Sequence, residues 1–497
     1  MALTAVCAAS SADCDVVARP GRGTLRAAQL AARARALAAA PGADVVVCLE
    51  PGEYLAAAAT PASPVLELTA EDAPPAGGGR VVWRGAGAVF SGGTRLTGWA
   101  AATYAGGAAY VAALPPAAPG EAAVVRQLWV AGARARRVTR SVASFLGALA
   151  PWSGAGGAGF VAAGALPAGF GDDALAARSI ELSWPVVVDN WISPRCTVAS
   201  VDAQARNITL AEPCGSLLVA RAKGSLPAPV TVEAVPGPGA GPLAPGEFFH
   251  DVAARRVFYA LAAGQAPADL EASATTSLAQ ELLTLANASG HAFEGVAFEF
   301  ATWAQPNSPD GYVDEQSTVI ACSSAAVTPG CAGGEAEPEG AVAVSGSSAI
   351  EFSNCSFAHI GAAWALSVDR GSQACAVRAC TFADLSGGFL KLGSVDAQFA
   401  SGAPARWDAH SVVADNTASD MAIEFEGAAG LFGGYLFNAS IEHNAISDAG
   451  YDGISCGWGW GASGPLAGHG ALWRLVARRA RGAPSARAAC ERGPLVR

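Results

Sequence analysis

Lysine and long apolar runs are both scarce in this sequence of 497 residues. The only lysines are Lys223 and Lys391, and the formal net charge is −11. A nucleic-acid surface needs clustered lysine or arginine to bind phosphates, so this charge balance argues against one over most of the molecule. A membrane-spanning helix needs a run of about 18 uncharged apolar residues, and the sequence contains none. We therefore expect no nucleic acid and no membrane among its partners.

The amino terminus also lacks the marks of a secretory signal peptide. Its opening stretch, MALTAVCAASSADC, has neither a basic start nor a full apolar run. The sequence nevertheless holds four N-x-S/T sequons, at Asn207, Asn287, Asn354 and Asn438. These are compatible with secretion, although such triplets also arise by chance. An extracellular or secretory location is accordingly a hypothesis.

The 12 cysteines form an even set that is too thinly spread for a small disulfide scaffold. Cys196 with Cys214, or Cys322 with Cys331, could close short loops in an oxidising compartment. Buried free thiols would explain the cysteines equally well. The cysteine pattern alone does not decide between these two interpretations.

Charged residues are few, at 15%, whereas hydrophobic residues reach 52%, which excludes a disordered chain. The 59 glycines and 30 prolines indicate many short strands and turns. An alanine-rich amphipathic pattern over roughly 24–40 predicts a helix, which Pro41 and Gly42 would end. We expect a mainly β protein with a helix near its amino terminus.

Five segments of the second half of the chain can be superposed on their third residue. They are VAFEFATW (296–303), CSFAHIG (355–361), CTFADLSG (380–387), NTASDMA (416–422) and NAISDAG (444–450), at offsets of 59, 25, 36 and 28 residues. Repetition near 25 residues with insertions is typical of a solenoid. A right-handed parallel β-helix explains this spacing, because each coil needs three short strands that pair with neighbours about 4.8 Å away. We expect Phe298, Phe357 and Phe382 to stack inside it, and Cys355 and Cys380 to form a buried thiol stack.

These patterns divide the chain into five expected parts. They are a disordered 1–23, a capping helix with the first coils over 24–104, an inserted β-sandwich-like domain over 105–285, a parallel β-helix over 286–461, and an irregular basic tail over 462–497. Seven arginines and one glutamate follow residue 465, where no coil pattern continues. We interpret this tail as a truncated or misread end rather than a basic binding arm. Missing coils could leave the protein inactive, so whether it is an enzyme stays open.

Three long segments resemble a known family. FEGVAFEFATWAQPNSPDGYVDEQ (293–316), IEFSNCSFAHIGAAWALSVDRGSQ (350–373) and LFGGYLFNASIEHNAISDAGYDGISCGWGWG (431–461) are similar to the right-handed parallel β-helix proteins related to glycoside hydrolase family 141. The resemblance covers roughly residues 20–461. It implies a pectin-lyase-like fold and a carbohydrate substrate, since that family includes α-L-fucosidase and xylanase activities. It does not supply the catalytic residues one by one.

Glycoside hydrolysis generally needs two carboxyl groups, one as acid and the other as nucleophile or base. In MAIEFEGAAG, Ile423 and Phe425 alternate with Glu424 and Glu426, so a strand that buries the apolar pair would turn both glutamates outward. Superposing Asp420 on Asp448 then stacks Glu424 over Asp452 of the next coil. A bulge would shift this register by one residue. Glu424 and Asp452 are the preferred catalytic pair, although solvated surface carboxylates are also common.

Other side chains are weaker candidates. Glu426, Asp369 and Asp448 are further candidate acids, but both aspartates are expected at turns, where aspartate often caps the backbone. The candidate sugar-binding aromatics are Trp458, Trp460, Trp303 and Tyr451. At least one of Trp458 and Trp460 should lie in the core instead. His359, His410 and His443 lack the close spacing of a zinc site, so we expect neither a metal nor a cofactor.

The sequence thus predicts a monomeric, carbohydrate-active β-helix protein, foremost a glycoside hydrolase acting on a plant- or algal-type polysaccharide. A non-catalytic polysaccharide-binding or cell-wall-associated protein is the first alternative. A polysaccharide lyase, with a basic residue near bound calcium, is the second. The lyase is less favoured because few basic residues, such as Lys391, Arg370 and Arg378, fall within the expected coils.

Overall fold

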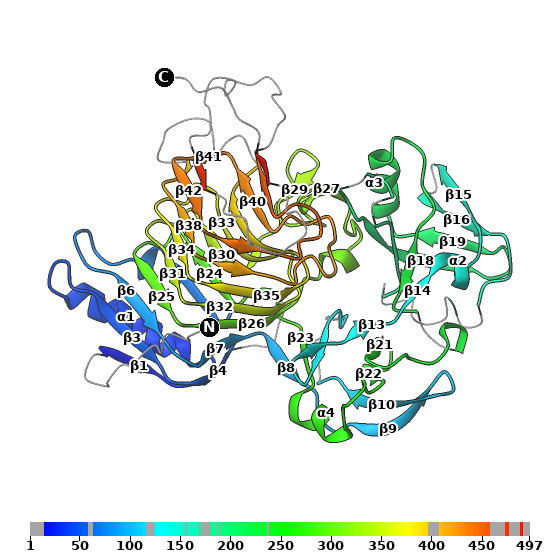
Figure 1. Cartoon of the computed structure of the whole chain (residues 1–497), viewed down its shortest axis with the longest axis horizontal. Coiled ribbons are helices and arrows are strands. Elements are labelled where there is room, and N and C mark those ends of the chain that lie inside the picture. The colour runs from blue at the N-terminus through cyan, green and yellow to red at the C-terminus, as the bar shows by residue number, and fades with distance from the viewer. Residues whose placement is uncertain are drawn as a thin grey trace.

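The computed structural model describes residues 14–457 except 58–62, 116–123, 155–156, 168–169, 171–178, 186, 190, 236–237 and 396–406, together with the strands over 473–476 and 488–490. The fold is mainly β, and three large parallel sheets, here called A, B and C, make up its larger part (Figure 1). None of the helices in the described part of the chain has the length and apolarity that a membrane crossing requires.

Sheets A, B and C consist of short strands that recur in chain order. In spatial order, sheet A contains β1 (Val16–Ala18), β3 (Val45–Leu49), β6 (Val81–Arg84), β25 (His291–Glu294), β31 (Glu351–Ser353), β34 (Ala376–Arg378), β38 (Val412–Ala414), β42 (Ala439–Glu442) and β45 (Trp473–Val476). Sheet B contains β2 (Gly21–Arg22), β4 (Gly52–Leu55), β7 (Ala88–Ser91), β26 (Ala297–Ala301), β32 (Ser356–Ile360), β35 (Thr381–Leu385), β39 (Thr417–Ala418) and β43 (Ala445–Ile446). Sheet C contains β5 (Leu66–Thr69), β24 (Leu283–Ala286), β30 (Gly340–Ser345), β33 (Trp364–Asp369), β36 (Gly388–Gly393), β40 (Leu431–Gly434), β44 (Ile454–Cys456) and β46 (Ala488–Cys490).

From β24 to β43 the chain visits sheets C, A and B in turn, so each of these circuits adds one strand to each sheet. The strand register aligns Phe298, Phe357 and Phe382 of sheet B with one another, and continues to Ala418 and Ile446. These are the third residues of the five segments, so the predicted superposition is confirmed. The three phenylalanine rings stack at centroid distances of 4.9 and 4.6 Å in the core that the sheets enclose.

A second column of side chains lies at the turn between sheets A and B. Cys355 and Cys380 are buried there on successive circuits, which confirms the expected thiol stack. The column continues with Asn416 and Asn444, and the Asn416 amide donates to the Asn444 carbonyl oxygen at 2.8 Å. Asn416 in turn accepts a hydrogen bond from the backbone N–H of Cys380. In these circuits this turn position therefore holds a small side chain, either a cysteine that is buried or an asparagine that hydrogen-bonds a neighbouring circuit.

The amino-terminal end of the stack is covered by helix α1 (Leu25–Ala38), as its amphipathic pattern predicts. Its buried side includes Leu25, Ala28 and Ala32, which join the core of the stack. Regular structure starts earlier in the chain than expected. The strands β1 and β2 lie within 1–23, which was predicted to be disordered, and they pair with β3 and β4. A disulfide between Cys14 and Cys48 ties this segment to β3.

The chain leaves the parallel sheets after β7 and rejoins them at β24, and the segment between forms further sheets to one side of the stack (Figure 1). One contains β13 (Arg136–Arg137), β21 (Glu247–Asp251), β22 (Arg256–Tyr259), β10 (Gly107–Ala113) and β9 (Ala100–Tyr104), and another contains β12 (Ala133–Arg134), β11 (Leu128–Val130), β23 (Thr275–Ser277) and β8 (Gly93–Arg95). The largest contains β14 (Thr139–Ser141), β20 (Thr231–Glu233), β17 (Glu181–Ser183), β18 (Arg195–Asp202), β19 (Asn207–Leu210), β16 (Gly157–Ala162) and β15 (Leu149–Gly154). Three short helices, α2 (Val142–Phe145), α3 (Cys214–Arg221) and α4 (Pro267–Ser273), accompany them. Because β8 pairs with β23, this segment, here called the insertion, starts and ends side by side at residues 93 and 277.

The carboxyl-terminal region is not irregular throughout, contrary to the sequence prediction. β45 pairs with β42 and β46 pairs with β44, so sheets A and C each gain a strand beyond residue 461. The prediction of an irregular tail failed because two strands of three and four residues are too short to be recognised in a basic segment without a repeat pattern. Trp458 and Trp460 lie outside the described residues.

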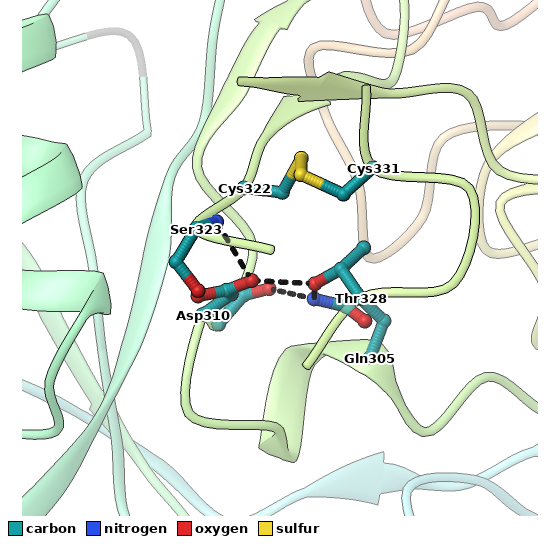
Figure 2. Close-up of a disulfide and its surroundings, with 7 residues drawn as sticks. Gln305, Asp310, Cys322, Ser323, Thr328 and Cys331 are labelled. Carbon is teal, nitrogen blue, oxygen red and sulfur yellow. Dashed lines mark hydrogen bonds between the residues drawn. A yellow bond between two sulfur atoms is a disulfide. The ribbon is translucent and has the colours of Figure 1, made fainter. Parts of the chain in front are cut away.

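Two disulfides close short loops, as the cysteine spacing suggested. Cys196 bonds Cys214 in the insertion, and Cys322 bonds Cys331 in the loop between β26 and β30. Figure 2 shows the second disulfide next to Asp310, whose Oδ2 accepts hydrogen bonds from the Ser323 N–H at 3.0 Å and the Thr328 hydroxyl at 2.7 Å. Ser323 and Thr328 both lie within the disulfide loop. The covalent bond and the Asp310 carboxyl therefore hold the same turn.

Removing this disulfide is expected to destabilise the protein moderately. For the double substitution Cys322→Ser and Cys331→Ser, we expect the free energy of unfolding to fall by about 2–3 kcal/mol, since the bond closes a loop with a sequence separation of 9. Denaturant unfolding followed by fluorescence measures this change. A control replaces Cys375, which is buried and forms no disulfide, with serine. Unchanged stability of the double variant would contradict a stabilising role for the disulfide.

Candidate active site

The outer face of sheet C carries a group of charged side chains that is here called the Asp369 cluster. Leu366 and Val368 of β33 face the core, as do Leu390 and Leu392 of β36. Because side chains of a strand alternate between its two faces, Asp369 at the end of β33 and its neighbours on β36 point outward. Glu337, from the segment between β26 and β30, lies against this face.

Asp369 and Lys391 form the centre of the cluster. The Lys391 Nζ lies 2.6 Å from Asp369 Oδ2 and 3.6 Å from Glu337 Oε2. The side chains of Asp369 and Lys391 are buried, whereas that of Glu337 is 13% exposed and marks the solvent side of the cluster. Burial by itself would lower the pKa of Lys391, but the charges of Asp369 and Glu337 raise this pKa above its ordinary value. Lys391 therefore stays protonated and holds the Asp369 carboxylate in place.

Asp408, which sequence analysis missed, supplies a second carboxyl group. It opens the short strand β37 (Asp408–Ala409), and its Oδ1 accepts hydrogen bonds from the N–H groups of Gly371 and Ser372, both at 2.9 Å. These two residues form the turn that directly follows Asp369. Burial raises the pKa of Asp408 to about 8, and the nearby charge of Asp369 contributes to this rise. Among the described residues, no group hydrogen-bonds its second oxygen, Oδ2.

The cluster thus combines two carboxyl groups of different character. Asp408 keeps its proton at neutral pH, whereas Asp369 is ion-paired with Lys391. A pair of carboxyl groups whose environments separate their protonation states is the arrangement that acid and base catalysis requires. The lysine is a poor candidate for a catalytic base, because its raised pKa opposes deprotonation.

Glu424, the preferred acid of the sequence analysis, lies in a different setting. The segment 421–427 forms no strand, and Ile423 is 46% exposed, so the expected alternation is wrong. A strand was expected because the pattern alternates, but a loop of this length can turn each side chain independently. The Glu424 side chain contacts Arg126 of the insertion, whereas Glu426 is exposed.

The Glu424 carboxylate is fully occupied by hydrogen bonds. Its Oε1 accepts from the guanidinium of Arg126, and its Oε2 accepts from the amide of Gln127 at 2.6 Å and from the hydroxyl of Ser386 at 3.2 Å. Burial would raise the pKa of Glu424, but Arg126 and two further arginines lower it to about 2. A carboxylate with every acceptor site filled is suited to holding structure together.

Arg126 links Glu424 to a wider ion network in the insertion, here called the interface network. Its members are Arg126, Arg137, Arg195, Glu181, Glu233 and Glu424. Glu181 accepts from both Arg126 and Arg137, and these arginines outweigh burial to hold the pKa of Glu181 well below its usual range. The guanidinium of Arg195 also donates to the backbone carbonyl of Glu424 at 2.7 Å. The network therefore joins the insertion to the stack.

Asp452 does not stack on Glu424 as predicted. The register of β40 and β44 pairs Leu431 with Ile454, which places Asp452 beside Ala429 and not beside Glu424. The segment between Ala422 and Gly430 is longer than the matching segment of the next circuit, and the superposition could not detect this. The neighbouring Tyr451 hydroxyl bonds Gln316 and Asp452, and burial raises the pKa of Tyr451.

The candidate aromatic residues differ in exposure. Trp303 is half-buried and packs edge to face against Tyr312 and Phe425, which suits a core role. Trp191 of the insertion is 36% exposed and was missed, because nothing in its sequence context distinguishes it. Its carbonyl oxygen lies against Gly427, and a Cβ there would approach it to 2.9 Å.

The loop that carries Trp191 is anchored two residues later. The N–H of Ser193 donates to both oxygens of Asp314, at 3.1 and 3.2 Å. Burial raises the pKa of Asp314 to about 7, although the Ser193 N–H opposes this rise. Trp191 is therefore an exposed aromatic side chain on a fixed backbone, at the boundary between the insertion and the stack.

Histidine is a common metal ligand, which makes the candidate histidines relevant to a metal site. His359 Nδ1 lies 2.7 Å from Asp384 Oδ2, which also accepts from the indole N–H of Trp129. Within the ranges that the structure describes, no group of three or more His, Cys, Asp or Glu side chains could hold a metal ion.

Comparisons with known proteins inform the fold. A scan against protein-family models finds no match, and a search of curated proteins finds none either. Among solved structures, the chain is similar to one titled "Glycoside hydrolase", with a TM-score of 0.67 and 22% identity over 88% of this chain and 76% of that chain. A structure titled "The complex structure of XylC with xylose" matches with a TM-score of 0.38 and 10% identity over 83% of this chain and 54% of that one. The first likeness supports a glycoside-hydrolase-like fold, and the second is too weak to inform it.

Proposed function

We propose that this protein is a glycoside hydrolase built on a right-handed parallel β-helix, with Asp369 and Asp408 as its catalytic carboxyl pair. The observation that carries the proposal is the pairing of Asp369 with Lys391 on sheet C, with the Asp408 carboxyl bound to the turn that follows Asp369. The likeness to a solved glycoside hydrolase supports the fold. The recurrence of one strand per circuit in each sheet supports the solenoid.

The two carboxyl groups would divide the reaction between them. Asp408 would donate its proton to the glycosidic oxygen as the bond between that oxygen and the anomeric carbon breaks. Asp369 would either attack the anomeric carbon or take a proton from the water that attacks it. The ammonium of Lys391 would keep Asp369 ionised and oriented at 2.6 Å. Glu424 and Asp452 are less favoured, because Glu424 is committed to the interface network.

Other sugar units of a bound polysaccharide would contact aromatic groups near the segments that precede β40 and β44, away from the carboxyl pair. The exposed indole of Trp191 offers a flat apolar surface for a pyranose ring. Tyr451 adds a hydroxyl group that already bonds Asp452. Plant- or algal-type polysaccharides are the proposed substrate class, and a monomer is the proposed working form.

A panel of polysaccharides tests this function against its alternatives. We expect a new reducing end for every bond cleaved, without calcium and without an unsaturated product. Calcium-dependent unsaturated products would instead identify a lyase. Binding on a glycan array without any release of reducing sugar would identify the non-catalytic binder.

The pH profile provides a further prediction. Since the acid must be protonated, kcat/KM is expected to fall as pH rises through about 8, the pKa of Asp408. Initial rates of reducing-sugar release across neutral and alkaline pH measure this fall in kcat/KM. Intrinsic fluorescence at each pH controls for unfolding. A rate that stays constant well above pH 8 in the folded protein would contradict the assignment of Asp408.

A further inference from the structure

Three of the four sequon asparagines lie at corners of the stack. Asn287 directly follows β24, Asn354 directly follows β31, and Asn438 directly precedes β42. All three are exposed. Their φ angles are 54°, 51° and 49°, in the left-handed region that asparagine tolerates better than most residues. Each asparagine therefore occupies a tight turn between strands.

The fourth sequon has a different environment. Asn207 opens β19 in the middle of the largest sheet of the insertion and is half-buried. Its Oδ1 accepts a hydrogen bond from the indole N–H of Trp152 at 2.7 Å. A glycan on the Nδ2 of this half-buried side chain would have to fit beside the neighbouring strands of the sheet when the insertion folds. Asn207 thus differs from the other three in lying within a sheet, whereas Asn438 is exposed although its Nδ2 lies 2.8 Å from His410 Nδ1.

The outer face of sheet A, next to Asn354, is open to solvent. Half-buried ion pairs cross it, between Arg80 and Glu351 at 2.6 Å and between Arg84 and Glu294 at 2.7 Å. Among the described strands, none of the insertion pairs with sheet A. A bulky group on Asn354 would extend into water without meeting the insertion.

The disulfides point independently to an oxidising compartment. Three are formed, Cys14–Cys48, Cys196–Cys214 and Cys322–Cys331, and disulfides persist in secreted proteins and in the secretory pathway. The thiols of Cys355, Cys375 and Cys380 are buried, which protects them from exchange. N-linked glycosylation takes place in that same pathway.

We propose that the protein matures in the secretory pathway and carries N-linked glycans on Asn287, Asn354 and Asn438 but not on Asn207. The hydroxyl groups that complete these three sequons, on Ser289, Ser356 and Ser440, are half-buried in the folded chain. Attachment therefore precedes the folding of each corner. The glycans then cover exposed turns of the stack.

The test uses the protein purified from its native source. Enzymatic release of N-glycans in water labelled with heavy oxygen converts each glycosylated asparagine into a labelled aspartate, which peptide mass spectrometry locates. We expect the label at Asn287, Asn354 and Asn438, and none at Asn207. An unlabelled asparagine among the first three, or label at Asn207, would overturn the proposal.

A variant series separates attachment from folding. The chain is expressed behind a host signal in a secretory eukaryotic cell, and Ser289→Ala, Ser356→Ala and Ser440→Ala each remove a sequon while keeping its asparagine. Each should lower the intact mass by one glycan, whereas Ser→Thr at the same positions should restore it. Thr209→Ala, which removes the Asn207 sequon, should leave the mass of attached glycan unchanged. A glycan lost in the Thr209 variant, or none lost in the serine variants, would contradict the assignment.

Discussion

Asp408→Asn is expected to lower kcat/KM on a cleaved polysaccharide by about a thousandfold, and Asp369→Asn by a similar factor. Asparagine has nearly the same shape as aspartate, but it can neither supply the proton of Asp408 nor replace the negative charge of Asp369. Initial rates of reducing-sugar release measure the loss. Thermal unfolding of each variant reports whether the fold is kept.

Glu339→Gln is the matched control for these two variants. Glu339 is a half-exposed carboxylate that pairs with Arg370 at 3.1 Å, near the cluster but outside it. We expect this substitution to leave the rate within about twofold, since an exposed ion pair contributes little. Folded Asp369→Asn and Asp408→Asn variants with the activity of the Glu339 control would show that the cluster is structural.

Arg126→Ala is expected to lower the free energy of unfolding by about 3–5 kcal/mol. The side chain is buried, and its removal leaves the carboxylates of Glu181 and Glu424 without a main partner. Denaturant unfolding measures the change. Arg19→Ala is the control, because Arg19 is 82% exposed and lies 3.7 Å from Glu50. Equal stability of the two variants would contradict a stabilising role for the interface network.

The same network predicts an acid limit of stability. The pKa of Glu424 is lowered to about 2 in the folded state, below its ordinary value. A lowered folded pKa stabilises the protein above the unfolded pKa of about 4.3, and this contribution is lost as pH falls toward 2. The difference in stability between the wild type and Glu424→Gln should therefore shrink over that range.

The repeats of the stack could be predicted from the sequence because their physics is local. Phe298, Phe357 and Phe382 recur at one position of each circuit, since a ring in the core packs best on the same ring of the next strand. The column of Cys355 and Cys380 follows the same logic. Helix α1 was predictable from its amphipathic pattern and from the proline that follows it.

The candidate site was harder to predict because it depends on contacts between distant segments. Asp369 was recognised as an acid, but the pKa of Asp408 is raised by burial and by the charge of Asp369, and both depend on how distant segments pack together. Glu424 was misjudged because the partner that buries it, Arg126, lies 298 residues away. A single sequence carries no record of such a pairing. Trp191 was missed for the same reason, since its exposure depends on how the insertion meets the stack.

The most direct measurement compares Asp408→Asn with Glu424→Gln on one polysaccharide, with each rate divided by the concentration of folded protein. We expect Asp408→Asn to unfold at nearly the wild-type temperature and to be inactive. We expect Glu424→Gln to unfold at a lower temperature, yet to cleave at close to the wild-type rate while folded. An active Asp408→Asn together with an inactive, fully folded Glu424→Gln would contradict the assignment of catalysis to the outer face of sheet C.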